Sequence, residues 1–425
     1  MADPQHQLSR DYASAPEAME MLGVRRQTLY AYVSRGWIRS IAQKGLKDKL
    51  YLRDDLARVG SRSLARSGHG AVAASAMNWG EPILETSITE ITPQGPRYRG
   101  QLAADLVRNA TPFESVAEML WSGQLPEHIP VWPVSKPSAA LLKLTRTMGA
   151  LKAGDNVLES FALVVLLLGL GRGPVAERLS AGKTLPAARE IIQTLVACCG
   201  FAGAEGRYRP MRKGQSVIDG LMNALGLPPD EENFDALRAV LILLADHELP
   251  PGTLGARVVA SAGGTLHSCI ASALCATSGI DVGRMYEHVQ DFLGKARSSA
   301  VLVNRARKLH AQGHTVPGFG HPLYPKGDPR AIQLLAIARS RSQQTPELRA
   351  VLRFIEQMQV ESSIFPRQEL AVVVLTRAMG LPAQVPAALF ALARVAGWVA
   401  HVQEQRTSGS LLRPRAKFVA PDQAN

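Results

Sequence analysis

The feature that most constrains this chain is a stretch of Gly and Pro at residues 313–330, which reads GHTVPGFGHPLYPKGDPR. Such a stretch cannot form the interior of a helix, because Pro lacks a backbone donor and its ring clashes with the preceding turn. The sequence therefore predicts a loop held in one shape. This loop presents the imidazole of His321 and the guanidinium of Arg330, with Tyr324 between them. A structural turn that carries a solvated histidine is the alternative interpretation.

Length and composition favour a soluble, helix-rich protein with more than one domain. The chain has 425 residues, of which 46% are hydrophobic and 20% charged. Its first twenty residues are polar and contain no signal peptide, and its longest apolar run, residues 161–170, is too short to span a bilayer. The four cysteines lack zinc-ligand spacing. We expect a cytoplasmic protein with reduced, buried thiols, a buried helix at 161–170 and no metal site.

The formal charge of +12 is concentrated near the two ends of the chain. Residues 1–66 hold twelve Lys and Arg against seven Asp and Glu, and residues 406–417 hold four basic residues and no acidic one. Basic surfaces suit anions such as nucleic acid, nucleotide phosphates or carboxylate substrates. Ordinary solubilising charge is the alternative explanation.

Residues 11–59 form a first predicted unit. Ser14 and Glu17 match a capping box, so a helix is expected to begin there and to end at Gly23. A second helix at about 25–35, a hairpin at 38–51 and a third helix from about residue 54 follow. The hairpin tip carries Lys44 and Lys47. Two helices joined by a Gly-containing turn, with polar and basic tips, are typical of a helix-turn-helix.

The string EAxxxLGVxxxTLYxYVxRGxIR, followed by a hairpin and YLxxDL, resembles the winged helix-turn-helix headpieces of MerR-like regulators and excisionases. The resemblance implies that the hairpin reaches the DNA backbone through its lysines. It places the start of the second helix in the major groove through Arg25, Arg26, Gln27, Thr28 and Tyr30. A protein-docking module is the alternative. We expect this domain at residues 1–60 and a linker rich in Ser, Gly, Ala and Arg at 61–76.

Residues 77–425 predict a second, mainly helical domain. A small hairpin is expected between residues 82 and 100, and later segments follow the helical period, with no βαβ alternation and no phosphate-binding glycine loop. The strings ETxITxI, YRG, FExVAxxLWxGxLP and GFGHxxYxxxDPR resemble the citrate synthase family over residues 79–419. The resemblance implies an all-α citrate synthase fold. Its large helical domain carries a smaller inserted one, here at about 284–388, and two subunits form an obligate dimer.

The same resemblance implies an acyltransferase of the tricarboxylic acid cycle, which condenses acetyl-CoA with oxaloacetate to citrate. No cofactor is expected beyond acetyl-CoA as co-substrate. Such chemistry needs a carboxylate base, a hydrogen-bond donor to the thioester oxygen, a second donor to the keto oxygen, and arginines for the substrate carboxylates. Matching strings assign the oxaloacetate side of the site to His247, His321, Arg330, Arg394 and Arg413. By resemblance, Arg413 reaches into the site of the partner subunit.

The acetyl-CoA side of the site departs from the family pattern. Where the family has SGPLHGGA, this chain has Ser278-Gly-Ile-Asp-Val-Gly-Arg-Met, so Val282 stands at the position of the histidine that polarises the thioester. The family string PNVDF aligns with PRQEL, which puts Glu369 at the position of the aspartate base. Losing one donor to the enolate oxygen costs about 10²–10³ in rate.

Two functions therefore compete at the level of sequence. One is a citrate-synthase-type acyltransferase with weak or altered activity, as a homodimer or beside an active paralogue in a heterodimer. The other is a catalytically inactive fold that senses oxaloacetate or a similar dicarboxylate, with the N-terminal unit bound to DNA or to a protein partner.

Overall fold

The computed structural model describes residues 12–34, 38, 40–42, 49–53, 55–56, 84–151, 155–170, 184–341 and 345–414. The chain divides into two units, Met1–Glu85 and Thr86–Asn425, and each is described here by itself. The predicted linker at 61–76 lies outside the described residues.

The first unit packs two helices against a three-stranded antiparallel sheet. Helix α2 is Ala15–Leu22 and helix α3 is Arg26–Ser34. The predicted capping box is confirmed, because the Ser14 hydroxyl accepts the Glu17 N–H while the Glu17 carboxylate accepts the Ser14 N–H. Gly23 ends the helix with φ +61°, which only glycine adopts without strain.

The sheet of the first unit has the strand order β1-β3-β2. Its strands are β1 Tyr12–Ala13, β2 Ser40–Ala42 and β3 Lys49–Leu52. The pairing of β2 with β3 confirms the predicted hairpin, whereas its tip with Lys44 and Lys47, and most of the predicted third helix, lie outside the described residues. Buried side chains from both helices and the sheet, among them Leu22, Leu29 and Tyr51, form a small core.

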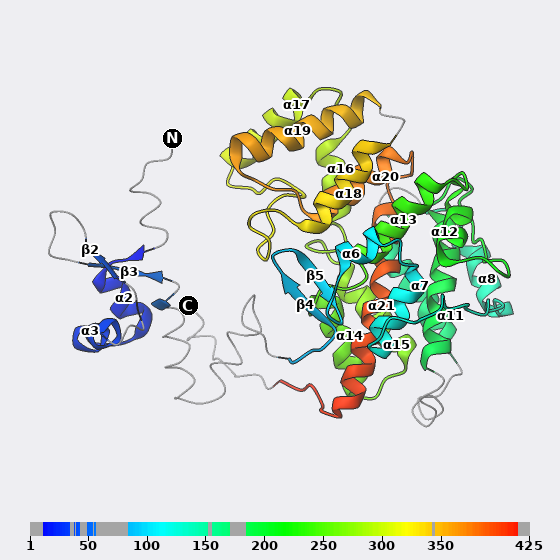
Figure 1. Ribbon diagram of the computed structural model, residues 1–425, viewed down its shortest axis with the longest axis horizontal. Helices are drawn as coiled ribbons and strands as arrows, with labels where there is room; N and C mark the ends of the chain where they lie inside the picture. Colours follow the sequence, from blue (N-terminus) through cyan, green and yellow to red (C-terminus); the bar gives the residue numbers. More distant parts are fainter. Residues whose placement is uncertain are drawn as a thin grey trace. The chain divides into compact units, whose positions relative to one another are not determined.

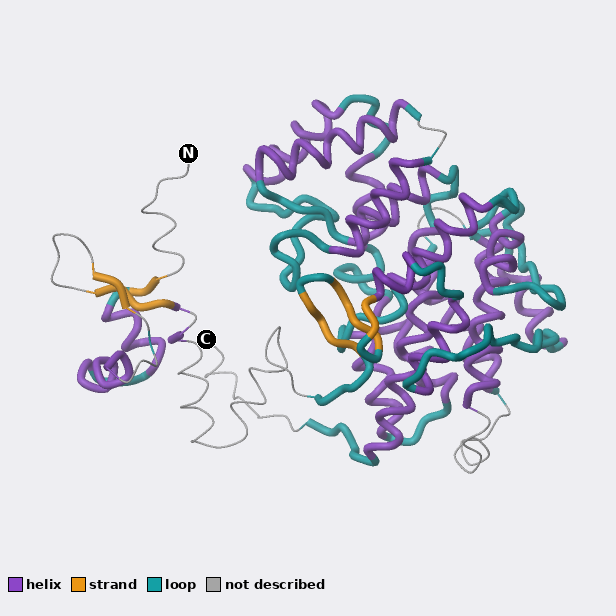
Figure 2. Tube along the Cα trace, in the orientation of Figure 1, coloured by secondary structure: helices purple, strands orange, loops and turns teal. Residues whose placement is uncertain are grey.

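The second unit opens with a three-stranded meander and is helical thereafter, as predicted (Figures 1 and 2). The strands are β4 Thr89–Thr92, β5 Gly95–Tyr98 and β6 Gln101–Leu102. The helices before residue 280 are α6 Ala103–Arg108, α7 Phe113–Ser122, α8 Ala139–Met148, α9 Val157–Gly169, α11 Thr184–Cys198, the 3-10 turn η2 Cys199–Phe201, α12 Val217–Leu225, α13 Glu231–Leu243, α14 Pro251–Ser261 and α15 Leu266–Thr277.

Five later helices lie side by side at one end of this unit (Figure 1), and they fall within the segment 284–388. They are α16 Met285–Leu293, α17 Ser299–Ala311, α18 Pro329–Ser340, α19 Pro346–Ser362 and α20 Gln368–Ala378. Helices α18 and α16 each pack against α20, and α17 packs against α19. The start of α20 therefore faces the loop at 313–330, which leads into α18.

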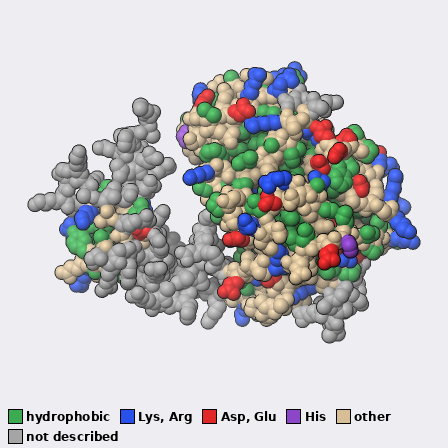
Figure 3. All heavy atoms as spheres, viewed as in Figure 1, with side chains coloured by type: hydrophobic (Ala, Val, Ile, Leu, Met, Phe, Trp, Pro, Cys, Tyr) green, Lys and Arg blue, Asp and Glu red, His purple; other side chains and the backbone are tan. Residues whose placement is uncertain are grey.

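The chain then returns to the main helical body through α21, Val385–Ser408. By length and hydropathy α21 could cross a membrane, but its apolar window is wholly buried in the unit, so it is a core helix. It contacts α7, α9, α11, α13, α14 and α15. On the face shown in Figure 3, the Lys and Arg side chains of this unit lie in separate groups interspersed with Asp and Glu.

Two burial expectations need correction. Residues 161–169 are helical in α9 as expected, but the helix is not buried all round, because Leu163 and Leu166 are 51% and 46% exposed. Of the four cysteines, Cys275 is exposed, and the other three are buried. An apolar, Ala-rich helix pattern does not distinguish the core from a surface that a partner covers, which is why both expectations were too simple.

Candidate active site

The loop at 313–330 has the fixed shape that its composition predicts. Phe319 forms an antiparallel bridge with Pro366, the Gly320 N–H donates to the Phe365 carbonyl at 2.9 Å, and the Arg367 N–H donates to the Gly318 carbonyl at 2.8 Å. Gly318 has φ +79°, and a Cβ there would lie 2.7 Å from that of Leu370. These contacts join the loop to the segment that begins α20.

His321, Tyr324 and His247 gather at the end of this loop. The ring centroids of His321 and Tyr324 are 4.9 Å apart, and those of His247 and His321 are 5.6 Å apart. The Nε2 atom of His247 lies 3.2 Å from the Tyr324 hydroxyl. Residues from two distant parts of the chain thus meet, as the sequence predicts for His247 and His321.

His321 is a neutral hydrogen-bond donor. Its Nδ1 accepts the backbone N–H of Leu323 at 3.1 Å, so the ring proton lies on Nε2. Burial, followed by the nearby guanidinium of Arg330, lowers the pKa of His321 to about 4. The Nε2–H is therefore available to a carbonyl oxygen at neutral pH.

His247 follows α13 and is almost fully buried. Burial, with Arg330 and Arg394 nearby, holds its pKa well below the usual value, so it is neutral. The next residue, Glu248, has φ +62°, an uncommon left-handed conformation that turns the chain toward α14 directly after the histidine.

A buried carboxylate supports this turn from behind. Asp246 is fully buried, and its Oδ2 lies 3.2 Å from Nε2 of His401 on α21. Burial raises the pKa of Asp246, but His401 and then Arg394 outweigh it, and the net pKa is lowered. A Cβ at Gly397 would lie 2.3 Å from Asp246 Oδ1, so only glycine lets α21 approach so closely.

Arg330 is held by its own loop. The buried carboxylate of Asp328 accepts from Arg330 Nε at 3.0 Å and from Nη2 at 2.8 Å, and it caps the start of α18. It also accepts the Gln368 N–H at 3.2 Å, which ties the pair to α20. Burial lowers the pKa of Arg330, but the ion pair with Asp328 outweighs it, so the guanidinium stays charged.

Arg394, in contrast, is a buried cation that makes no ion pair with the other described residues, although the nearby charge of Asp246 favours its charged form. It is 3% exposed in the middle of α21, and its Nε has no hydrogen-bond partner among the described residues. Its guanidinium carbon lies 5.2 Å from the ring centroid of Phe390. Burial lowers the pKa of Arg394, which shows that this environment disfavours the charge. A charge buried in this way is costly unless an anion joins it.

Among the described residues, neither Arg413 nor the side chain of Val282 makes a hydrogen bond, ion pair or ring contact with this group. Arg413 is exposed on the segment after α21 and makes no hydrogen bond or ion pair with the other described residues. Val282 is half-buried in the turns that join α15 to α16, and its side chain has no donor. His288, the nearest histidine in the sequence, lies within α16.

Glu369 lies in the first turn of α20, almost fully buried, at the position predicted for the base. Both of its oxygens are already engaged, because Arg367 Nε donates to Oε2 at 3.1 Å and Nη2 donates to Oε1 at 3.0 Å. Sequence reasoning missed this pair. It also missed the Tyr286 hydroxyl, which donates to Gln368 Oε1 at 3.0 Å beneath the same helix start.

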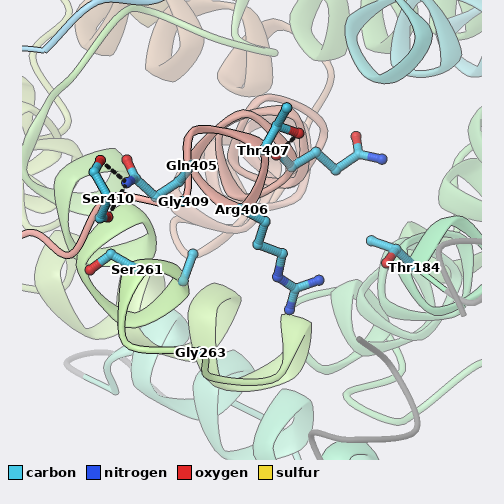
Figure 4. A pocket seen from close by; sticks show the side chains of 10 residues that line it. Thr184, Ser261, Gly263, Gln405, Arg406, Thr407, Gly409 and Ser410 are labelled. Atoms are coloured by element: carbon cyan, nitrogen blue, oxygen red, sulfur yellow. Dashed lines mark hydrogen bonds between the residues drawn. The ribbon is translucent and has the colours of Figure 1, made fainter. Parts of the chain in front are cut away.

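A cavity of the second unit lies away from this group. It holds about 580 Å³ and is lined by Thr184, Ser261, Arg406 and Ser410, among others, at the end of α21 (Figure 4). Arg406 extends between Gly263 and Thr184 in this view, and its Nη2 donates to the Gly264 carbonyl at 3.0 Å. None of the predicted site residues lines this cavity. Among the described residues, no cluster of three or more His, Cys, Asp and Glu could hold a metal ion.

The second unit is thus a mainly helical body in which two neutral histidines and two buried arginines lie close together, near the loop at 313–330 and α21. The family model for "Citrate synthase, C-terminal domain" matches residues 76–415. The chain belongs to the citrate synthase family.

Characterised relatives and solved structures agree with this membership. Citrate synthase 2 of Bacillus subtilis is 26% identical over 367 residues, which cover 79% of this chain and 93% of the relative. A 2-methylcitrate synthase of Mycobacterium tuberculosis is 27% identical over 354 residues, which cover 80% and 88%.

Two citrate synthase structures share the fold. One is from Thermoplasma acidophilum, in a ternary complex with carboxymethyl coenzyme A and oxaloacetate. It superposes with a TM-score of 0.70 at 23% identity, over 80% of this chain and 94% of that one. The citrate synthase of Thermotoga maritima superposes with a TM-score of 0.67 at 25% identity, over 81% and 96%. The family match begins at residue 76, so most of the first unit lies before it.

Proposed function

We propose that the second unit binds oxaloacetate or a closely related dicarboxylate between the loop at 313–330 and α21, and that it condenses this ligand with acetyl-CoA only slowly. The ligand carboxylates pair with Arg330 and Arg394, and Nε2–H of His321 donates to the keto oxygen. Like other citrate synthases, the protein would need no cofactor apart from a CoA substrate.

The observation that carries this proposal is the buried guanidinium of Arg394, whose Nε has no partner among the described residues. His247 is neutral, and Asp328 already engages Nε and Nη2 of Arg330. The positive charge of Arg394 is therefore the one that a ligand carboxylate would compensate most strongly. Two donors and two guanidiniums at one place suit a small dicarboxylate better than a phosphate ester or a neutral molecule.

Slow condensation follows from the other half of the site. Val282 offers no donor to the thioester oxygen, and Glu369 is already held by Arg367. One missing donor costs about 10²–10³ in rate. A non-catalytic subunit that only senses the dicarboxylate, or that supports an active paralogue, would show the same pocket with no measurable turnover.

Calorimetry tests the binding step directly. We expect heat on titration of the whole protein with oxaloacetate and with malate, and none with pyruvate, which has a single carboxylate. The Arg353→Asn variant serves as the control, because Arg353 is exposed on α19 and has no partner among the described residues. No heat from oxaloacetate at millimolar concentration would rule out the proposed function.

We further propose that two copies of the chain pair through the exposed face of α9. Leu163 and Leu166 are half exposed on this helix, and Val258 is 41% exposed on α14, which packs against α15 as α9 does. Pairing would let Arg413 reach the site of the partner. We expect sedimentation velocity to give a dimer, and the Leu163→Asp, Leu166→Asp double variant to give a monomer. A paralogous citrate synthase is the alternative partner.

A DNA-binding role for the first unit is a second candidate, in a cytoplasmic regulator. Two helices followed by an antiparallel pair of strands, as in α2, α3, β2 and β3, support this candidate. At the start of α3, Arg25, Arg26 and Gln27 are exposed, and Tyr30 is 47% exposed and accepts a hydrogen bond from Arg26 Nε at 2.9 Å. Thr28 is half-buried. Exposed basic and polar side chains at a helix start suit the major groove.

Fluorescence anisotropy with a random duplex tests this second candidate. We expect the affinity for DNA to fall steeply as the salt concentration rises. If Arg25 and Arg26 both contact phosphates, the slope of log K against log salt concentration should be smaller by about 2 in the Arg25→Ala, Arg26→Ala double variant. Equal affinity for the double variant and for Arg353→Asn would contradict DNA binding through α3.

A further inference from the structure

The ion pair between Arg367 and Glu369 lies at the point where the family's base is expected, and it is partly buried. Both contacts are close to 3 Å, and they join two guanidinium nitrogens to two carboxylate oxygens. The side chains are 27% and 10% exposed. A fork of this kind fixes the geometry of the carboxylate as well as its charge.

The backbone on each side of the pair is fixed as well. The Arg367 N–H bonds to the Gly318 carbonyl, and the Gln368 N–H bonds to Asp328. The pair is therefore attached to the same loop that carries His321. Both Arg367 and Glu369 are close enough to His321 to influence its pKa, in opposite directions.

From this geometry we propose that Arg367 is a positioning residue that clamps Glu369, so that the site retains a dicarboxylate but takes a proton from a thioester only slowly. The inference rests on the proposed function. A general base must be directed at the C–H bond that it breaks, and the bidentate fork fixes the direction of the Glu369 carboxylate. The pair also cancels the negative charge of Glu369, which would otherwise repel a dianion in the pocket.

The clamp acts on one step of the reaction. There, a C–H bond of the acetyl methyl breaks, its proton goes to an oxygen of Glu369, and the electron pair moves to the thioester oxygen. The resulting enolate then attacks the keto carbon of oxaloacetate, and the keto oxygen takes a proton from solvent to become a hydroxyl. Water hydrolyses the thioester of the product to release CoA, and Glu369 returns its proton to solvent. The fork with Arg367 occupies one acceptor site on each oxygen of Glu369, so it fixes the direction in which the remaining sites point.

Arg367→Asn is a mild way to open the clamp. Arg367 is the N-cap of α20 and has the extended backbone of a cap, φ −94° and ψ 167°, but its side chain makes no capping bond. Asn is among the preferred N-cap residues, so the variant should keep or improve the helix start. Glu369 remains in the first turn of α20, where the helix dipole stabilises its charge.

The test measures CoA release from acetyl-CoA and oxaloacetate by three proteins. The first is the Val282→His variant, and the second combines Val282→His with Arg367→Asn. The third combines Val282→His with Arg353→Asn and is the matched control. We expect the double variant to raise kcat at least tenfold over Val282→His, with a smaller change in KM for oxaloacetate, and the control to leave both unchanged. If the Arg367–Glu369 pair only supported the fold, the Arg367→Asn change would lower the kcat of Val282→His or leave it unaltered.

Calorimetry with oxaloacetate on the same proteins separates the two possible failures. If the wild-type protein gives no heat, the proposed function fails, and the clamp fails with it. If oxaloacetate binds but the double variant releases CoA no faster than Val282→His, the proposed clamp is wrong and the proposed binding of the dicarboxylate stands. The same conclusion holds if neither variant turns over. A kcat gain that the control variant shares would also overturn it.

Discussion

His321 accepts the backbone N–H of Leu323 through Nδ1, at 3.1 Å, and this bond decides which ring nitrogen serves a ligand. A backbone N–H can only donate, so the neutral ring must carry its proton on Nε2. The tight turn that follows Gly320 thus selects the tautomer before any ligand arrives. The donor that a keto oxygen requires is built into the loop.

The first prediction concerns this donor. In His321→Gln, the terminal amide can place an N–H where Nε2 lies, whereas His321→Ala removes the donor. We expect oxaloacetate to bind His321→Gln within about threefold of wild type, and His321→Ala at least about fivefold more weakly, which corresponds to about 1 kcal/mol for one hydrogen bond. Calorimetry measures both dissociation constants. Equal losses for the two variants would show that the ring does not act as a donor.

The second prediction concerns acid stability. The pKa values of His321 and His247 are lower in the folded protein than the ordinary 6.5, to about 4 for His321. Between pH 6.5 and 4 the unfolded chain therefore binds protons that the folded chain does not, and the free energy of unfolding falls as pH falls through this range. Above pH 6.5 the two histidines cause no pH dependence.

Chemical denaturation at several pH values checks this expectation. The His247→Gln, His321→Gln double variant, whose amides do not titrate, should lose less stability than wild type between pH 6.5 and 4.5. Asp246 and Asp328 do not affect this comparison, although their pKa values are lowered in the folded protein. The stability that they contribute is lost only at pH values below their ordinary pKa of 3.8. An equal slope for wild type and double variant above pH 4.5 would contradict the assignment.

Local sequence rules predicted the local features well. The density of Gly and Pro at 313–330 predicted a loop, and Gly318, at φ +79° against Leu370, shows why glycine is needed there. The capping box at Ser14 and the hairpin formed by β2 and β3 were also predictable, because each depends on residues close together in the chain. The prediction that His247 and His321 belong to one site, although they are far apart in the sequence, came from motifs shared with a known family.

What the sequence could not reveal were partners set by three-dimensional contact. Asp246 and His401 are 155 residues apart, and only the fold brings them within 3.2 Å. Arg367 and Glu369 are neighbours in sequence, but whether two such side chains meet or diverge at a helix start depends on the cap geometry. The exposed leucines of α9 resemble core leucines in any sequence pattern, because a subunit interface and a core use the same residues.

The third prediction concerns Arg394. Its environment disfavours the charge, since burial lowers its pKa and its Nε has no partner among the described residues. Arg394→Met fills a similar volume without a charge. We expect the variant to be more stable than wild type by about 1 kcal/mol in the absence of ligand, since a buried charge is often less favourable than a packed apolar side chain. We also expect it to lose oxaloacetate binding.

Thermal unfolding with and without oxaloacetate checks both parts of the third prediction. Ligand should raise the Tm of the wild type and leave that of Arg394→Met unchanged. A variant that is less stable than wild type and still responds to oxaloacetate would mean that Asp246 compensates the charge of Arg394 fully, and that the ligand binds elsewhere.

The fourth prediction concerns catalysis and the role of Arg284. We expect the wild-type protein to release CoA from acetyl-CoA and oxaloacetate at least a hundredfold more slowly than a typical enzyme turnover of about 10 s⁻¹, because Val282 cannot donate to the developing enolate oxygen. Arg284 replaces a family glycine two residues later. Its guanidinium lies 3.7 Å from the carboxylate of Glu287, one turn along α16, and is 41% exposed.

That orientation directs Arg284 along the helix surface, so it should not hinder the thioester. Adding Arg284→Gly to the Val282→His, Glu369→Asp double variant should therefore change kcat by less than about twofold, because an exposed ion pair of this kind contributes roughly 0–1 kcal/mol. A coupled assay of free CoA measures all three proteins. A large gain from Arg284→Gly would show that the arginine obstructs the acetyl-CoA side. Ordinary turnover by the wild type would show that another group donates to the enolate in place of the missing histidine.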